Sequence, residues 1–486
     1  MSLKLHFHLS LLMIALLAVF TTNAQSHADW TLEEAIQYAL DHNLSIQQNE
    51  LNRRLEKLTL QQNRLAQLPN INVSSGYGRS FGRSIDPTTN QFVEGSSYDF
   101  MSISGNADVL LFGWFQRRNR IVQSKYALQA ANKEYEQIQN DVSLNVANGF
   151  LRLLLAEEQV KINEQQVALS KEQLEQTRNF AEAGSVPELN VAQLQAQLAS
   201  DSANLIGAIS EQNAALLDIK ALLNLDFSQP FTVTIPAIED IEKGFSNVYM
   251  KPEDIYATAS RVLPTLYSSE MRLKAAKKGA DAAKGGLFPQ LALNMQAGTN
   301  YSTLNKDYDV TGTTYTPSSG VFALDNINNT QYQVYQLTPV FTTSTTPLGL
   351  QLDNNFRQSV SLGVNIPLFN GWQAQTTLKQ ARINVLSQQL NLEQAELKLK
   401  QDVYKAQNDA RNALQKYYAA LRAAEAAKRA QEFAKQRNDL GLTNTVEYLV
   451  IQNNWYKAEA TLASSKYDLI FKIKVIDYFL GNEIKL

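Results

Sequence analysis

Cysteine is absent from all 486 residues of the chain, and histidine occurs only four times. Without thiols the chain has no disulfide, no thiolate metal site, no cysteine nucleophile and no cysteine for a lipid anchor. Only His27 and His42 lie outside the predicted signal peptide, and we interpret both as structurally incidental. The usual groups of acid–base catalysis and metal binding are therefore scarce. We expect no metal, no cofactor and no enzymatic activity.

The chain also has little net charge and few long apolar runs. A net charge of -3 gives no reason to expect nucleic acid or an anionic surface as a partner. The apolar run at 11–20 follows Lys4 and precedes Thr22-Asn23-Ala24, which is typical of a signal peptide cleaved after Ala24. This run is too short to span a bilayer, which takes about 20 apolar residues. We expect an exported protein without a transmembrane helix.

One sequence pattern occurs twice in the chain. A heptad-spaced apolar row recurs 257 residues later; it consists of Ile121, Leu128, Tyr135 and Val142 in the first copy and Leu378, Val385, Leu392 and Leu399 in the second. The same offset relates Leu111-Phe112 to Leu368-Phe369, and Gly184 to Gly441. Each copy is therefore predicted to be one unit, a very long coiled-coil helical hairpin.

Both predicted hairpin turns combine a helix stop with a helix start. Gly184 and Gly441 suit the left-handed position that follows a helix. Capping-box spacing follows in each turn, with Ser185 before Glu188 and Asn444 before Glu447. We expect the first rising helix to occupy the chain from just after Trp114 to Ala183, and the descending helices to end near Leu223 and Leu480.

Each hairpin is preceded by an entry helix and by strands. The first entry helix is expected to start at Trp30 and to run unbroken until Pro69 stops it. The segment 252–288 repeats it at an offset of 220. Alternation of apolar and small polar residues then predicts four strands, each with one apolar face. Those faces carry Ile71, Val73 and Tyr77; Met101, Ile103, Gly105, Ala107 and Val109; Leu291, Leu293, Met295 and Ala297; and Val360, Leu362, Val364 and Ile366.

These features predict four segments of the chain. They are a signal peptide at 1–24, a first repeat at 25–225, a linker at 226–251 and a second repeat at 252–486. Within the linker, 231–236 is expected to be extended, as a linker or an edge strand. The segments 79–97 and 299–355 are interpreted as loops, and the longer one is expected to plug a barrel, bind a partner or be disordered.

The four predicted strands have the length of membrane-spanning strands, about 9–11 residues. Four strands cannot close a barrel, because the smallest bacterial outer-membrane barrels have about eight. An open sheet would leave unpaired backbone groups in lipid at a cost of several kcal/mol each. Several copies must therefore share one barrel, and this arithmetic leaves a dimer, a trimer and a tetramer open.

The chain resembles the TolC family of outer-membrane efflux proteins. The resemblance rests on the order and duplicated spacing of several motifs over essentially all of the mature chain. They are Trp30-Thr31-Leu32-Glu33-Glu34-Ala35, the strand starts at Pro69 and Pro289, the junction Pro367-Leu368-Phe369-Asn370-Gly371-Trp372, and the paired Gly184 and Gly441. It implies a mixed α/β membrane protein, with a trimeric twelve-stranded β-barrel in the bacterial outer membrane continued by a long periplasmic α-helical tube.

The resemblance also implies a function. The homotrimer would be the passive exit duct of an efflux pump or a type I secretion system. A periplasmic adaptor (membrane fusion) protein and an inner-membrane pump or exporter would be its partners. The alternative is a barrel-anchored trimeric coiled-coil adhesin or structural stalk, which the presence of strands in both halves disfavours. An exported enzyme that uses carboxylates is the third possibility.

Three groups of site residues follow from the resemblance. The periplasmic tips that contact the adaptor would contain Gly184, Ser185, Pro187, Gly441, Thr443 and Asn444. Glu447 and Asn190 would line a pore constriction, where symmetry copies of Glu447 form a carboxylate ring. Trp114 and Trp372 would be anchors at the membrane interface. The structural alternatives are helix capping for the tips and Glu447, and junction packing for the tryptophans.

Overall fold

The computed structural model describes residues 29–82, 84–85, 90, 92–93, 97–234, 241–440, 442 and 445–482. The chain forms two compact units, each built from several separate stretches of sequence. Unit 1 draws on Met1–Lys57, Tyr126–Lys274 and Leu386–Leu486 and is mainly helical. Unit 2 draws on Leu58–Lys125 and Ala275–Val385 and contains the main sheet.

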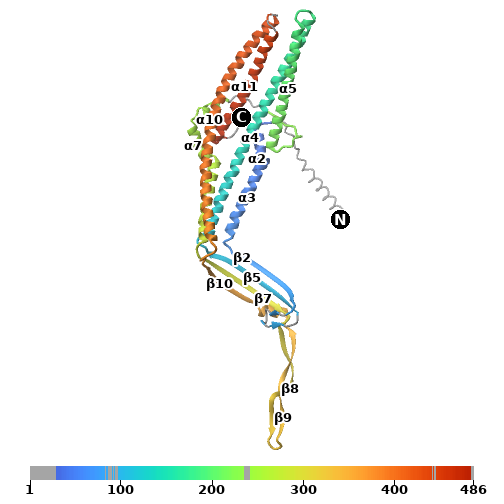
Figure 1. Cartoon of the computed structure of the whole chain (residues 1–486), viewed down its shortest axis with the longest axis vertical. Helices are drawn as coiled ribbons and strands as arrows, with labels where there is room; N and C mark the ends of the chain where they lie inside the picture. The colour runs from blue at the N-terminus through green and yellow to red at the C-terminus, as the bar shows by residue number, and fades with distance from the viewer. Residues whose placement is uncertain are drawn as a thin grey trace, which may run out of the picture. The chain divides into compact units, whose positions relative to one another are not determined.

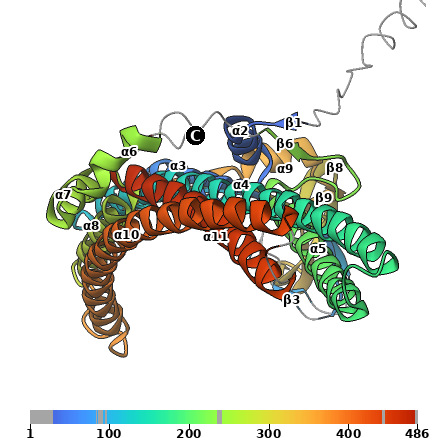
Figure 2. The ribbon, with the colours of Figure 1, turned by 90° about the horizontal axis from the view of Figure 1, so that it is seen from above.

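The predicted duplication is confirmed in the long helices. The rising helices α4 (Gln116–Glu182) and α10 (Gln373–Asp439) both have 67 residues and start 257 residues apart. The descending helices α5 (Glu188–Leu223) and α11 (Thr445–Leu480) both have 36 residues and keep the same offset. In each pair the two helices run side by side from a shared turn (Figures 1 and 2).

The prediction of an unbroken entry helix is wrong. Trp30 belongs to the short strand β1 (Asp29–Trp30), and two helices follow it, α2 (Leu32–His42) and α3 (Leu44–Leu65). Asn43 separates them with an extended backbone, and its side-chain oxygen accepts hydrogen bonds from the N–H groups of Ser45 and Ile46 at the start of α3. An asparagine oxygen that caps new N–H groups favours a helix start over continuation.

The second half repeats this break at the offset of 220. Here α7 (Pro252–Val262) ends before α8 (Pro264–Gly285). Leu263 between them is extended, because a residue that precedes proline is driven out of the helical region. A different residue type therefore produces the same break in each half.

The two largest apolar clusters of unit 1 belong one to each half, and a smaller third cluster contains Leu174, Val191, Leu194 and Leu449. The first packs α2 against α4 and α5, and the second packs α7 against α10 and α11. Corresponding positions are fully buried in both clusters, as the pairs Ala39 and Ala259, Val146 and Val403, and Ile219 and Ile476 show. The repeated sequence pattern thus becomes a repeated core.

A four-stranded antiparallel sheet forms the centre of unit 2. Its order is β10 (Arg357–Asn365), β7 (Gln290–Ser302), β5 (Tyr98–Phe112) and β2 (Asn70–Ser80), so β10 and β2 are its edges (Figure 1). The register places the predicted apolar residues on one face: Val73 lies opposite Gly105, Gly105 opposite Ala297, and Met295 opposite Val360. The four predicted strands are confirmed.

The interpretation of 299–355 as a loop is wrong. This segment continues β7 and then forms the hairpin β8 (Lys306–Asp325) and β9 (Thr330–Thr345), followed by the short helix α9 (Leu348–Asn354). The hairpin is a two-stranded sheet of its own (Figure 1). Its many threonines, tyrosines and valines are β-formers, and the prediction gave too much weight to the glycines, asparagines and serines between them.

Short elements complete the two units. In unit 1 the expected extended segment is β6 (Thr232–Val233), which pairs in parallel with β1, and α6 (Ile241–Val248) follows within the predicted linker. In unit 2 a small pair, β3 (Ser84–Ile85) and β4 (Phe92–Val93), lies between β2 and β5 in the sequence. Part of the predicted connection 79–97 falls outside the described residues.

Candidate functional sites at the helix turns and junctions

The turn between α4 and α5 is a tight C-terminal helix cap. Gly184 has a φ of +75°, and its N–H donates to the carbonyl of Ala181 at 2.9 Å. The N–H of Ser185 donates to the carbonyl of Phe180 at 2.8 Å. This pair of bonds is the Schellman motif, which requires a left-handed residue where Gly184 stands. The helix-capping interpretation of Gly184 is therefore confirmed.

The predicted capping box of the first turn is wrong. The N-cap of α5 is Pro187 rather than Ser185, and among the described residues its side chain makes no capping hydrogen bond. A proline that fixes φ near the start of a helix replaces the side-chain cap. Asn190, which corresponds to Glu447 in the second half, donates its N–H to the carbonyl of Pro187 at 3.0 Å.

One hydrogen bond of the first turn has its counterpart among the described residues of the second. The N–H of Leu442 donates to the carbonyl of Arg437 at 2.9 Å, the counterpart of the bond from Ser185 to Phe180. A nitrogen of Arg437 also lies 4.0 Å from a carboxylate oxygen of Glu447, and both side chains are more than half exposed. Such an exposed pair contributes little to stability. Gly441, Thr443 and Asn444, and with them the second capping box, lie outside the described residues.

Both tryptophans predicted at the strand-to-helix junctions do lie there. Trp114 and Phe115 have φ values of 48° and 63°, and Gly371 and Trp372 have 62° and 66°. Trp372 therefore corresponds to Phe115, one position later than Trp114. Two consecutive left-handed residues form the same sharp turn in each half, and positive φ at bulky side chains is uncommon.

The surroundings of the two tryptophans differ. Trp114 packs on Phe288 with ring centroids 4.7 Å apart, and on Phe112 at 5.6 Å. Trp372 is 58% exposed, and the ammonium of Lys379 lies 5.0 Å from the centre of its ring. Trp114 thus has a packing role at its junction, whereas Trp372 presents most of its ring to the surroundings.

A buried carboxylate joins three helices in unit 1. Asp201 on α5 is 1% exposed. It accepts hydrogen bonds from Ser170 Oγ at 2.6 Å, Gln166 Nε2 at 2.7 Å and Gln197 Nε2 at 2.9 Å. Gln166 and Gln197 also donate to Asn453 of α11, at 3.0 and 3.2 Å. This network links the first hairpin to the second. Side-chain donors replace the water molecules that would otherwise hydrogen-bond to the Asp201 carboxylate.

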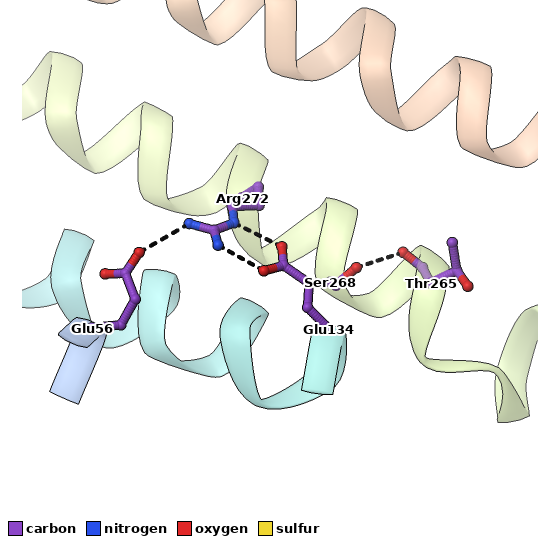
Figure 3. Close-up of polar contacts among 5 residues, drawn as sticks. All are labelled: Glu56, Glu134, Thr265, Ser268 and Arg272. Atoms are coloured by element: carbon purple, nitrogen blue, oxygen red, sulfur yellow. Dashed lines mark hydrogen bonds and ion pairs between the residues drawn. The ribbon is translucent and has the colours of Figure 1, made fainter. Parts of the chain in front are cut away.

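An ion-pair cluster joins the two halves of the chain elsewhere in unit 1 (Figure 3). Arg272 on α8 donates to both carboxylate oxygens of Glu134 on α4, at 2.9 and 2.8 Å, and to Glu56 on α3 at 3.2 Å. The hydrogen bond to Glu134 is the main cause that raises the pKa of Arg272. The planar guanidinium suits this two-pronged contact.

A second polar contact lies beside this cluster. Thr265 of α8 donates to Gln137 of α4 at 2.7 Å, and Gln137 donates to Asp141 at 2.7 Å and to the hydroxyl of Tyr478 at 2.9 Å. Burial raises the pKa of Asp141 and that of Tyr478, the latter to about 12. These shifts reflect a partly dry helix interface.

Two further kinds of feature are absent from the described residues. In the part of the chain that the structure describes, His, Cys, Asp and Glu side chains nowhere gather in threes as a metal ion would require. Among the same residues, none of the helices has the length and apolar character needed to cross a membrane.

Sequence reasoning missed Asp201 and Arg272. Asp201 continues the apolar helical row of Val191, Leu194 and Leu198, and a carboxylate in such a row signals a buried polar contact. Arg272 carried no comparable signal, because charged residues are common on both of its flanks. Its partner could not be found without knowing which helices lie together.

The sequence matches the family model of outer membrane efflux proteins over residues 35–225 and 258–471. No curated protein sequence matches the chain.

Solved structures of outer-membrane proteins share the fold. The CmeC outer membrane channel of Campylobacter jejuni has a TM-score of 0.74 at 18% identity, over 93% of this chain and 86% of that chain. VceC of Vibrio cholerae has a TM-score of 0.70 at 15% identity, over 93% and 96%. The open state of the MtrE channel of Neisseria gonorrhoeae has 0.69 at 17% identity, over 93% and 89%.

Proposed function

Since the chain belongs to the outer membrane efflux protein family, and is therefore an outer-membrane channel with a periplasmic helical tube and not an enzyme, we propose that three copies form the exit duct of an efflux pump. The three sheets close one twelve-stranded barrel. An inner-membrane pump supplies the energy, and a periplasmic adaptor protein joins the pump to the helix turns. Membership in this family sets aside the alternative of an adhesin or stalk.

The observation that carries the assembly is the pair of open edges of the sheet. Among the described residues, the edge strands β2 and β10 each pair with one strand, so the other side of each keeps N–H and C=O groups without a strand partner. In lipid each unpaired group costs several kcal/mol. Pairing of β2 in one copy with β10 in the next removes both edges, and repetition closes the ring.

Exposed apolar side chains on two helices of unit 1 support the same assembly. On α3, Leu55 is 64% exposed, and on α10, Leu390 is 64% exposed. On the apolar face of the sheet, Val73 and Val360 of the two edge strands are also exposed, as expected for a surface that meets lipid. A contact between α3 and the α10 of the next copy would cover the two helix faces.

We assign the hairpin turns to the adaptor contact. Gly184, Ser185 and Pro187 form the first turn, and Gly441, Thr443 and Asn444 belong to the second. A Cβ atom added at Gly184 would have no other atom within 4 Å, and this open space would allow another helical hairpin to approach closely. Trp372, with its exposed ring, is the better candidate for a membrane-interface anchor, and Trp114 is the second.

The assembly is tested by native mass measurement and cryo-EM of the full-length protein extracted from outer membranes. We expect a mass of three chains and a hollow tube with three-fold symmetry. The helical part should extend on the order of 100 Å, since a helix rises about 1.5 Å per residue. A solid stalk, or any other copy number, would overturn the proposal.

Glu447 is proposed to narrow the duct together with its symmetry copies, with Asn190 beside it. Replacement Glu447→Gln should increase the single-channel conductance in planar bilayers, because it removes three charges and the contact with Arg437. Glu188→Gln is the matched control: Glu188 is an acidic residue at the start of α5 and should leave conductance unchanged. Equal conductance of wild type and Glu447→Gln would leave Glu447 outside the constriction.

A further inference from the structure

The hairpin of β8 and β9 has one apolar and one polar face. The register and the bulge at Thr311 place Tyr308, Tyr315 and Phe322 of β8 on the same side as Tyr335, Leu337 and Phe341 of β9. The other side is mainly polar: it carries Asp309, Thr314 and Thr316 with Thr338 and Thr342, and also Tyr332 and Val340. A strand pair with this alternation is built to bury one face.

The residues that the structure describes leave this apolar face largely open. Tyr315 is 70% exposed, Tyr335 is 57% exposed and Phe341 is 50% exposed. An isolated two-stranded hairpin is at best marginally stable in water. The five aromatic side chains on the face could bury about 150–250 Å² each, which approaches the roughly 800 Å² per partner of a stable interface.

The base of the hairpin is fixed to the sheet. Gln351 of α9 is fully buried; it donates to the carbonyls of Ser302 and Thr346 at 3.0 and 2.8 Å and accepts from the N–H of Ser302 at 3.0 Å. Thr346 also donates to Asp307 at 3.0 Å. The hairpin therefore leaves the sheet from a defined place between β7 and the edge strand β10, at the end opposite to the helix junctions.

We propose that the apolar faces of these hairpins pack against one another in the assembled channel, each covered by the hairpins of the other copies. This inference rests on the proposed trimer. Because β10 is the edge that meets the next copy, the hairpin continues that interface beyond the sheet. Three hairpins held at one end of one barrel have a high effective concentration for each other. Their packed faces form a cap over that end of the duct.

The lack of charge on the apolar face and the positions of two prolines favour contact between the hairpin faces of identical copies. Strand β9 has no charged residue in its sequence, and the apolar face has Lys306 only at its base. An uncharged face offers nothing to a nucleic acid or an anionic headgroup, and copies of it do not repel each other. Pro317 and Pro339 lie in β8 and β9, both edge strands, where proline opposes pairing with a further strand.

Single cysteines test this packing, because the natural chain has none. Tyr335→Cys places a thiol on the apolar face, and Thr314→Cys places one on the polar face near the same level as a matched control. Both full-length variants are oxidised in outer membranes and then dissociated on denaturing gels. We expect a crosslinked dimer as the main product of Tyr335→Cys and little crosslinking of Thr314→Cys. Adding Tyr315→Ser and Leu337→Ser to Tyr335→Cys should reduce the crosslink several-fold.

Native mass measurement of the same samples distinguishes a failure of the hairpin packing from a failure of the trimer. An intact trimer in which Tyr335→Cys stays uncrosslinked would overturn the packing of hairpins and leave the trimer standing; lipid, glycan or another protein would then cover the face. Equal crosslinking of both faces would also overturn it, because a freely moving hairpin has no preferred face. Loss of the trimer itself in the unmodified protein would overturn the proposed function, and the packing with it.

Discussion

The two halves of the chain have helices of equal length that differ in what covers them. On α8, Met271 and Ala275 are 4% and 7% exposed, whereas their counterparts on α3, Leu51 and Leu55, are 61% and 64% exposed. α8 lies against α4 of its own chain, as the bond from Thr265 to Gln137 shows. α3 also touches α4 and α8 of its own chain, through Asn63 and Glu56, but the face of α3 that carries Leu51 and Leu55 is exposed. We expect another copy to cover this face.

The same comparison predicts which helix of the next copy would cover this face of α3. By the offset of 257, the counterpart of α4 is α10, so the contact of α4 with α8 corresponds to a contact of α10 with α3 of the next copy. The offsets convert Gln137 and Thr265 into Gln394 and Ser45, which keep the amide and the hydroxyl. An internal duplication thus supplies a template for an interface between chains.

The largest expected effect comes from placing a charge on each of the two helices. Leu55→Asp should abolish the trimer and leave a folded single chain, because the carboxylate would be buried only in the assembly. The matched variant Ala275→Asp should instead destabilise the chain itself by several kcal/mol, since its position is already buried. Native mass and thermal unfolding in detergent measure the two effects. A normal trimer from Leu55→Asp would contradict the assignment of α3 to the interface.

The halves also differ in their buried polar groups. Asp201, Ser170 and Gln166 of the first half correspond to Ala458, Ala427 and Ala423 of the second. One hairpin therefore has a carboxylate network where the other has small apolar residues. Repetition of the backbone does not require repetition of the polar interior.

This difference predicts a partial rescue. Asp201→Ala should destabilise the first hairpin by about 1–3 kcal/mol, because Ser170 and Gln166 lose a buried acceptor. Adding Ser170→Ala and Gln166→Ala, which copies the second half, should recover part of that loss. Hydrogen exchange of the α4 and α5 amides measures both changes. The predicted rescue would be wrong if the triple variant were less stable than Asp201→Ala by the sum of the effects of Ser170→Ala and Gln166→Ala measured alone.

The duplication and the strand faces could be predicted from the sequence because both depend on local periodicity. The offset of 257 located both hairpins, and the alternation around Val73 and Val360 placed the apolar face of the sheet. The break at Asn43 was missed because an amide inside a helical pattern gives no sign of whether its side chain caps a new helix. The β8–β9 hairpin was missed because threonine and tyrosine occur in loops as well as in strands.

The candidate sites were less predictable, because they depend on which helices lie together. Gly184 was assigned correctly from its turn, where the sequence alone demands a left-handed residue. Ser185 was wrongly assigned as an N-cap. Pro187 is the N-cap, so α5 begins two residues later than the capping-box spacing suggested. The cluster around Arg272 joins helices that lie far apart in the sequence, and pairing of that kind is set by the tertiary fold.

The smallest expected effect gives the sharpest test of whether the contact of α4 with α8 is a template for the contact between copies. The pair Arg272 and Glu134 has Asn52 and Asn391 as its counterparts, both exposed in the single chain. If α10 meets α3 of the next copy as α4 meets α8, the double variant Asn52→Arg with Asn391→Glu creates the same two-pronged ion pair at each of the three interfaces. Each pair contributes about 0.2–1 kcal/mol at an exposed site, so the trimer should dissociate at a higher temperature on denaturing gels. Either variant alone supplies one charge without its partner and should leave that temperature unchanged or lower it. A double variant no more stable than the singles would show that the contact between copies does not follow the contact within the chain.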